Sequence, residues 1–224
     1  MSEKLNFGFD FPLDEIERII GVTINGDSGG YERVVSPRAL IQVHDISLLR
    51  EDVVRGIVGS VCLRGTNKLP YLGCEMSIFR SEPYGFKVGQ TFILEDKILG
   101  IMENLEGNLL SGFPTRGISK LPPLKIYGQD AERRKVIAFY LPPIVEHHDG
   151  RAVLIDGMHR NYICSSSGTT INAVHIYSPN YPLPFDPITW KDTKVVKGKP
   201  PKDQRYINLR TDLFRDLGSV GIDG

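Results

Sequence analysis

The chain of 224 residues is long enough for one sizeable hydrophobic core or two small ones. Hydrophobic residues make up 41% of it and charged residues 24%, which excludes wholesale disorder. The 27 basic and 27 acidic side chains give a net charge of zero. A general role in binding the phosphate backbone of nucleic acids therefore loses weight, because such proteins usually carry a basic excess.

Short helices and strands are predicted for the first half of the chain. A proline at position 12, acidic residues in the next turn and Gly21 are typical of a helix over residues 12–20. Apolar residues at helical spacing predict two more helices, and short apolar runs predict strands. These further elements are helices over residues 46–58 and 95–110 and strands over residues 75–79 and 91–94.

The middle of the chain contains the best candidate for a domain boundary. Residues 112–123 are rich in glycine, proline and serine, as linkers and turns often are. A strand over residues 124–127 is expected to follow. Residues 130–139, with an acidic start and a basic middle, then favour a short helix.

The most informative passage of the sequence lies between residues 142 and 177. Apolar runs at 143–147 and 152–155 flank Asp149-Gly150, which is a strong signal for a β-hairpin. The second run continues into a glycine turn and a short helix that begins near residue 159, and a further strand is expected at 171–177. The pattern predicts a strand that leads through a tight turn into the first turn of a helix.

Four residues of this turn suit a phosphate group. The N-terminus of a helix gathers unpaired N–H groups and positive dipole charge, and Gly157 lets a phosphate approach the backbone. Arg160 can hold two phosphate oxygens, and His159 can donate a hydrogen bond or transfer a proton. Asp156 can bind a magnesium ion or orient a hydroxyl group.

A purely structural interpretation of the same residues stays open at this point. Asp156 would then only cap the helix that follows, and Arg160 would pair with Glu146 across the hairpin. The succession of strand, glycine turn, histidine-arginine pair and helix tips the balance modestly towards a functional site.

The passage resembles the ParB/sulfiredoxin-like superfamily. The shared features are the Pro-Pro-Ile-Val strand from residue 142, the Asp-Gly-Arg hairpin at 149–151 and the Asp-Gly-Met-His-Arg box at 156–160. The resemblance covers residues 121–190 and implies a small mixed sheet with short helices. In sulfiredoxins the residue before His-Arg is a reactive cysteine. The chain has Met158 there, which argues against sulfiredoxin activity.

Two other branches of the superfamily suggest different functions. In the free-serine kinases a similar box holds nucleotide phosphates, and an upstream glutamate serves as base. The carboxylates upstream in this chain are Asp130 and Glu132, of which we select Glu132. In partition ParB proteins a DNA-reading helical domain follows the box. The 34 residues after Trp190 are too few for such a domain, so centromere binding is disfavoured.

Three features outside the box have plain structural interpretations. His147 and His148 are expected at a solvent-exposed hairpin end, since neighbours on a strand point to opposite faces and would rarely share a metal ion. Cys164 is expected to be a small buried residue. Residues 191–215 contain eight basic and three acidic side chains and are expected to form a solvated segment, with an extended linker at 197–202 and a short helix at 212–217.

Together these observations predict an α+β protein in three parts. Residues 1–115 would form an N-terminal α/β extension, residues 116–190 the ParB/sulfiredoxin-like nucleotide-binding domain, and residues 191–224 a basic tail with a short helix.

The expected activity is that of an ATP- or ADP-dependent phosphotransferase acting on a small hydroxylated metabolite. The catalytic residues would be Asp156, His159 and Glu132. The nucleotide phosphates would be held by Gly157, Met158, His159 and Arg160, and Mg²⁺ by Asp156.

Two alternatives remain: a nucleic-acid-binding or nuclease-like protein that uses the basic tail, and a nucleotide sensor without catalysis. Three cysteines without paired spacing, an N-terminus unlike a secretory signal and the absence of a ~20-residue apolar run further predict a cytoplasmic protein without a membrane partner.

Overall fold

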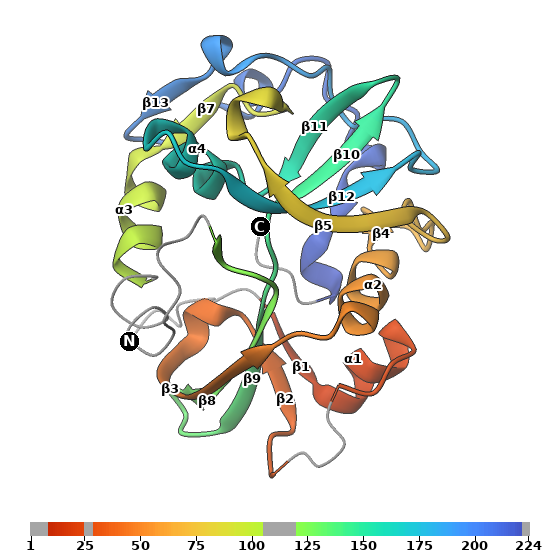
Figure 1. Cartoon of the computed structure of the whole chain (residues 1–224), viewed down its shortest axis with the longest axis vertical. Helices are drawn as coiled ribbons and strands as arrows, with labels where there is room; N and C mark the ends of the chain where they lie inside the picture. Colours follow the sequence, from red (N-terminus) through yellow and green to blue (C-terminus); the bar gives the residue numbers. More distant parts are fainter. Residues whose placement is uncertain (1–8, 25–28, 105–119, 221–224) are drawn as a thin grey trace. The chain divides into compact units, whose positions relative to one another are not determined.

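The computed structural model describes residues 9–24, 29–104 and 120–220, and its helices and strands belong to two compact units (Figure 1). The first unit consists of residues 1–61, 123–141 and 216–224, and the second of residues 62–122 and 142–215. Each unit is built from separated stretches of the chain. The expected parts, by contrast, were continuous segments with limits at 115 and 190.

The first unit contains a five-stranded mixed sheet. Its strands lie in the order β1 (Asp10–Pro12), β2 (Arg33–Val35), β9 (Lys135–Tyr140), β8 (Leu124–Asp130) and β3 (Leu40–Leu48). Only β2 and β9 are parallel neighbours, and the other pairs are antiparallel. Two helices, α1 (Leu13–Ile20) and α2 (Glu51–Gly59), pack against each other. The unit also contains the short 3-10 turns η1 (Pro37–Ala39) and η8 (Leu217–Val220).

Two predicted helices of this unit are wrong in part or in whole. Residues 46–58 divide into the end of β3 and the helix α2, because Ile46 and Leu48 pair with strand β8. Residues 130–139 form a turn and strand β9 instead of a helix. The carboxylate of Asp130 accepts hydrogen bonds from the N–H groups of Glu132 and Arg134, which holds the turn, and the five residues that follow Lys135 are all buried.

The second unit contains another five-stranded mixed sheet, in the order β5 (Glu75–Ser81), β12 (Ile171–Tyr177), β10 (Ile144–His148), β11 (Arg151–Asp156) and β6 (Lys87–Val88). Strands β10 and β11 form the expected antiparallel hairpin. Helix α4 (Met158–Ser166) follows β11 and leads to β12, which lies parallel to β10. This succession confirms the elements predicted for residues 142–177.

The remaining elements of the second unit surround this sheet. Strand β7 (Phe92–Leu94) pairs with β13 (Lys194–Val196) and leads into helix α3 (Glu95–Asn104). The predicted strands at 75–79 and 91–94 are confirmed. The predicted helix at 95–110 is confirmed to residue 104, and its last residues and most of the stretch 112–123 lie outside the described residues. The other short elements are β4 (Cys62–Leu63), β14 (Arg215–Asp216), η2 (Pro83–Gly85), η5 (Trp190–Asp192), η6 (Lys202–Gln204) and η7 (Thr211–Leu213).

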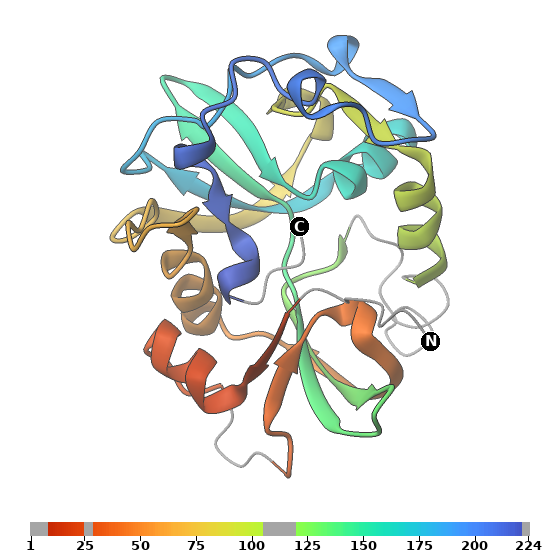
Figure 2. The same ribbon diagram turned by 180° about the vertical axis from the view of Figure 1, so that it is seen from behind.

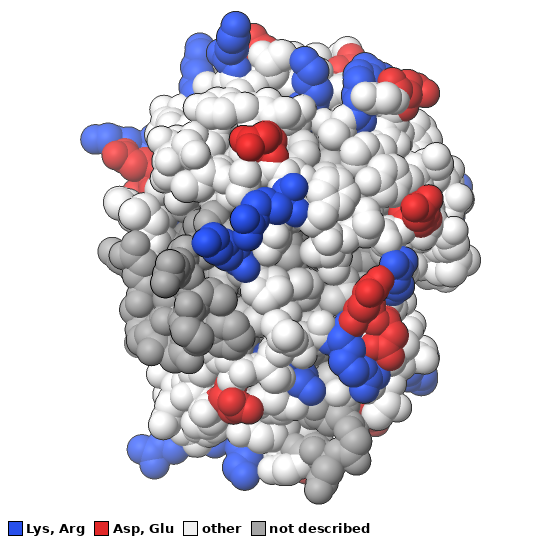
Figure 3. Space-filling model, in the orientation of Figure 1, with Lys and Arg blue, Asp and Glu red and all other residues white. Residues whose placement is uncertain are grey.

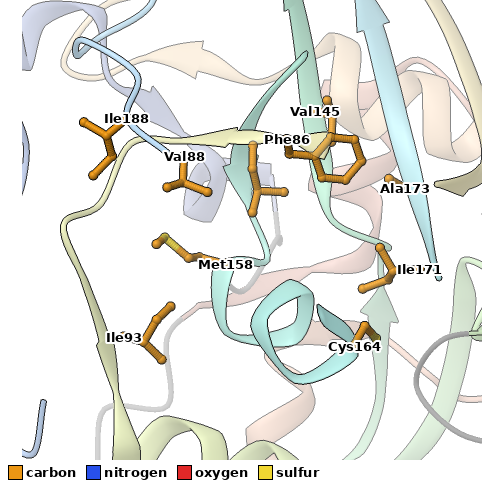
Figure 4. Close-up of a cluster of buried hydrophobic side chains, with 10 residues drawn as sticks. Phe86, Val88, Ile93, Val145, Met158, Cys164, Ile171, Ala173 and Ile188 are labelled. Atoms are coloured by element: carbon orange, nitrogen blue, oxygen red, sulfur yellow. The ribbon is translucent and has the colours of Figure 1, made fainter. Parts of the chain in front are cut away.

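Each face of the second sheet carries its own hydrophobic cluster. Val145 and Leu154 pack with Met158 and Cys164 of α4 on one face (Figure 4). Val153 points to the other face, since neighbours on a strand alternate, and it packs there against Leu183 and Phe185. The second sheet is therefore covered on one face by α4 and on the other by the chain that follows β12, which Figure 2 shows from behind.

The described structure is a mixed α+β protein, as expected. In the part of the chain that the structure describes, no helix is long and apolar enough to cross a membrane.

Candidate functional site

The predicted turn at residues 156–160 lies in the second unit, between strand β11 and helix α4. Gly157 has a φ of 82° and immediately precedes the helix. A Cβ atom at this position would lie 2.7 Å from Cγ of Pro143, which is far too close. Both the positive φ and the contact with Pro143 therefore require glycine, for reasons that the sequence expressed only as a turn signal.

The N-cap residue of α4 is Gly157, which has no side chain that could cap the helix. Its first hydrogen bond within the helix runs from the N–H of Asn161 to the carbonyl oxygen of Gly157, at 2.9 Å. The N–H groups ahead of it have no partner inside the helix, and the dipole makes this end positive.

Asp156 and Arg160 form an ion pair one helical turn apart. The guanidinium Nη2 lies 2.9 Å from Oδ2 of Asp156, and the two side chains are only 12% and 5% exposed. The alternative pairing of Arg160 with Glu146 is wrong, because Glu146 pairs with Arg215. Arg160 stands beside the helix N-terminus, but its charge is largely balanced by the neighbouring carboxylate.

His159 is oriented by the backbone of β7. Its Nε2 accepts a hydrogen bond from the N–H of Leu94 at 3.1 Å. A neutral imidazole in this arrangement carries its proton on Nδ1. The half-buried ring of His159 lies in the first turn of α4 with its orientation set by this bond.

The side chain of Met158 faces away from a ligand at the turn. It packs with Val88 and Ile93 in the core cluster of Figure 4 and is 9% exposed. Only its backbone can contribute to phosphate binding. Cys164 lies in the same cluster and is fully buried, as expected, and burial raises the pKa of its thiol. A buried thiol with a raised pKa is a poor nucleophile.

Glu132 and the turn at 156–160 belong to different units. Glu132 belongs to the first unit, on the exposed turn between β8 and β9, where its Oε2 lies 3.3 Å from Nε of Arg134. In the described ranges, no three histidine, cysteine, aspartate or glutamate side chains come together in a way that could hold a metal ion. A magnesium ion on Asp156 would have to compete with the guanidinium of Arg160.

Sequence reasoning missed a buried ionic cluster on strand β10. Glu146 is fully buried, and its carboxylate accepts hydrogen bonds from the Tyr71 hydroxyl at 2.7 Å and from Nε and Nη2 of Arg215 at 2.7 and 2.9 Å. Nε2 of His148 also lies 2.5 Å from this carboxylate. The one signal in the sequence was a glutamate inside an otherwise apolar strand, and nothing there identified its partners.

The two neighbouring histidines are therefore not a solvent-exposed hairpin end, as had been expected. His148 contacts Glu146 on one face of the sheet, and Nε2 of His147 lies 2.9 Å from Nδ1 of His175 on the other. Both rings are half-buried. The alternation of strand faces was predicted, but the partners on each face were not.

The basic segment belongs to the second unit, and most of its basic side chains are exposed, as expected for a solvated segment. Three arginines are nevertheless held within the unit. Arg215 is 2% exposed, Arg205 donates to the carbonyl oxygen of Pro200 at 2.7 Å, and Arg210 donates to that of Leu183. In place of the expected helix at 212–217, the chain forms the 3-10 turn η7 and strand β14 and then enters η8. Basic and acidic side chains are interspersed on the face of the molecule shown in Figure 3.

Comparison of the chain with protein-family models, with curated proteins and with solved structures found no match in any of the three. The choice of a site therefore depends on the geometry of the described residues.

Proposed function

We propose that the chain is a nucleotide-dependent phosphotransferase of the ParB/sulfiredoxin-like type, whose nucleotide phosphates bind at the N-terminus of α4. The observation that carries the proposal is the turn at Gly157. It combines a backbone position that requires glycine with the N-terminus of a helix. Such an end binds phosphate through backbone N–H groups and the helix dipole.

Two side chains in the first turn of α4 would assist. His159 would contact a phosphate oxygen from the first turn of α4, where the N–H of Leu94 donates to its Nε2 and orients the ring. Arg160 would share its guanidinium between Asp156 and the phosphate, since it has donors on more than one edge. The rate gain would come from positioning and charge neutralisation.

The described residues fit a phosphate group better than they fit a metal ion. Asp156 is already paired with Arg160, so Mg²⁺ would be carried in by the nucleotide and held by its phosphates. A bound Mg²⁺ ion would supply neutralising charge to the phosphates. The general base for the acceptor hydroxyl, expected at Glu132, has no assigned place in this site.

A role in nucleic-acid binding is less well supported. Arg205, Arg210 and Arg215, three of the eight basic side chains in the segment 191–215, donate hydrogen bonds to backbone carbonyl groups or to Glu146. They are therefore occupied within the second unit.

Isothermal titration with ATP, ADP and adenosine, with and without Mg²⁺, tests the proposal. We expect ATP and ADP to bind and adenosine not to bind, because the helix N-terminus recognises phosphate. His159→Gln should weaken ATP binding about tenfold, the effect of one lost hydrogen bond to a charged group. The matched control is His44→Gln, at a histidine of the first unit that contacts Tyr31, and its ATP affinity should be unchanged.

The proposal would be overturned if neither ATP nor ADP gave a heat of binding, or if adenosine bound as tightly as ATP. If ATP binds, phosphorus NMR in a mixture of small hydroxylated metabolites shows whether its γ-phosphate is transferred. Binding without any transfer would support the nucleotide sensor over the phosphotransferase.

A further inference from the structure

A chain of hydrogen bonds crosses three neighbouring strands of the second sheet, independently of the turn at Gly157. Oγ of Ser81, at the end of β5, lies 2.9 Å from Nε2 of His175 on β12. Nδ1 of the same ring lies 2.9 Å from Nε2 of His147 on β10. A hydroxyl group, a first imidazole and a second imidazole thus stand in one line, joined at both nitrogens of the middle ring.

The two rings are held in their planes by aromatic neighbours. The Phe79 ring stacks on His175 with centroids 3.9 Å apart and planes 6° apart, and the Tyr177 ring stacks on His147 at 4.4 Å and 19°. The ring of Phe86 also contacts His175 in an edge-to-face arrangement, with ring centroids 5.9 Å apart. Because the residues sit on paired strands, their relative positions are set by the sheet register, which gives the precision a reactive site needs.

We propose that Ser81, His175 and His147 form a nucleophile, a general base and a positioning residue for acyl transfer from small neutral esters. This is the arrangement that activates a serine: a base within hydrogen-bond reach, itself oriented by a third group. His175 accepts the hydroxyl proton at Nε2, and its Nδ1–H donates to Nε2 of His147, which keeps the middle ring in the required tautomer.

The surroundings of His175 keep its ring unprotonated at neutral pH, so that Nε2 can accept a proton, while the lowered pKa makes the ring a weaker base than an ordinary histidine. Burial and the neighbouring His147 lower the pKa of His175 to about 4, so the ring is unprotonated at pH 7. Burial also lowers the pKa of His147. In contrast to the ring of His175, which is 2% exposed, Ser81 is half-buried and within reach of a ligand at the end of the strand.

The neighbouring surface indicates the class of substrate. The ring of Phe79 is 44% exposed and stands directly beside the base, so the acyl group that reaches Ser81 meets an apolar aromatic surface. An uncharged ester with an apolar acyl group is the ligand that this surface favours.

The reaction needs no reactant other than the ester and water. Ser81 Oγ forms a bond to the acyl carbon, its proton moves to Nε2 of His175, and the bond from the acyl carbon to the leaving alkoxide breaks as that proton is delivered to the alkoxide. Water then repeats the step on the acyl-serine and releases the carboxylic acid.

The test is labelling of the full chain with a fluorophosphonate probe, followed by peptide mass mapping, together with hydrolysis of p-nitrophenyl butyrate. We expect the label on Ser81, and its loss in Ser81→Ala. His175→Gln should slow labelling at least about 100-fold, the usual effect of removing a general base. The matched control is Ser77→Ala, a serine of the same strand whose Oγ donates to the Tyr177 hydroxyl, and its labelling should equal that of the natural chain.

The positioning role of His147 has its own readout. His147→Gln keeps an acceptor for the Nδ1–H of His175 and should retain more activity than His147→Leu, which removes the acceptor. Equal losses in both variants would contradict the positioning role. Circular dichroism of each variant, and its ATP binding, show whether the second unit is still folded, so failure here is distinguishable from failure of the nucleotide site.

One measurement needs no variant. Nitrogen-15 NMR of the natural chain should show His175 as the Nδ1–H tautomer at pH 7, with Nε2 unprotonated. An Nε2–H tautomer would overturn the proposal, since the ring could not then take the proton of Ser81. Labelling of a residue other than Ser81, or no labelling at all, would overturn it as well.

Discussion

At the scale of single residues, the stability of the second unit depends on polar side chains buried at its sheet. Glu146 lies between Tyr71, His148 and Arg215, so its buried charge is both paired and hydrogen-bonded. Such a cluster is costly to break, because removing one partner leaves an uncompensated charge in a low-dielectric interior. Burial and the nearby carboxylate of Glu146 also raise the pKa of Tyr71 well above its usual value, so this tyrosine remains a hydrogen-bond donor.

His175 predicts how stability changes with pH. Its pKa is about 4 in the folded chain, whereas the ordinary value of 6.5 applies to the unfolded chain. Between these two values the unfolded chain therefore binds more protons. The free energy of unfolding should therefore have its full value above pH 6.5. It should decrease as the pH drops towards 4, by about 3 kcal/mol from this ring alone. Urea unfolding at pH 7.5 and pH 4 measures the loss.

The control for this prediction is His175→Gln, which removes the titrating ring and keeps a polar side chain. Carboxylates and His147 also titrate in this range. The quantity that matters is therefore the difference between the natural chain and the variant in the stability lost from pH 7.5 to pH 4. An equal loss of stability in both would show that His175 does not carry the effect.

At the scale of elements, local patterns predicted residues 142–177 well. The Asp149-Gly150 turn, the run into Gly157, helix α4 and strand β12 were all predicted, because each signal involves residues close together in the sequence. Strand β9 was mistaken for a helix for the opposite reason. Its residues are buried by neighbours on both sides, β8 and β2, and a continuous buried run has no period that distinguishes strand from helix.

The turn before β9 supplies a test at this scale. Oδ1 of Asp130 accepts from the N–H groups of Glu132 and Arg134, at 3.0 and 2.9 Å. Asp130→Ala removes the oxygen that accepts both hydrogen bonds and should lower the free energy of unfolding by about 1–3 kcal/mol. Asp130→Asn keeps an oxygen in place and loses the ion pair with the half-exposed Arg134, so it should cost less than the alanine variant.

Chemical denaturation of the natural chain and the two variants measures both effects. If the asparagine variant lost as much stability as the alanine variant, the ion pair with Arg134 would matter more than the hydrogen bonds that hold the turn.

At the scale of the whole molecule, the chain crosses between its two units four times along the sequence. Residues 191–215 belong to the second unit, where β13 pairs with β7 and Arg215 closes the cluster around Glu146. The domain expected at residues 116–190 differs from the second unit, which excludes residues 123–141 and includes residues 62–115 and 191–215. A chain cut at residue 190 should therefore not keep this unit folded.

Truncation after Trp190 tests this expectation. The shortened chain lacks the partner of Glu146, and loss of one member of a buried ion pair costs about 3–5 kcal/mol. Limited proteolysis and amide hydrogen exchange should show an unfolded second unit. The matched control is the full chain with the exposed Lys197 and Lys199 changed to alanine, which removes positive charge from the same segment and should remain folded.

A separate variant distinguishes the ion pair from the rest of the segment. Arg215→Met in the full chain leaves Glu146 buried without its guanidinium and should be strongly destabilised. Addition of Glu146→Gln should restore part of the loss, since the amide carries no charge. A truncated chain that remains as protected as the full chain would contradict the place given to residues 191–215.

What the sequence determined by itself was the local geometry of residues 142–177. The hairpin, the glycine turn and the helix after it follow from backbone preferences of neighbouring residues, which act whatever the rest of the chain does. The tertiary structure alone decided which side chains meet: Glu146 with Arg215, 69 positions away, and Ser81 with His175, 94 positions away. Such pairs depend on strand order and register, which no short stretch of sequence specifies.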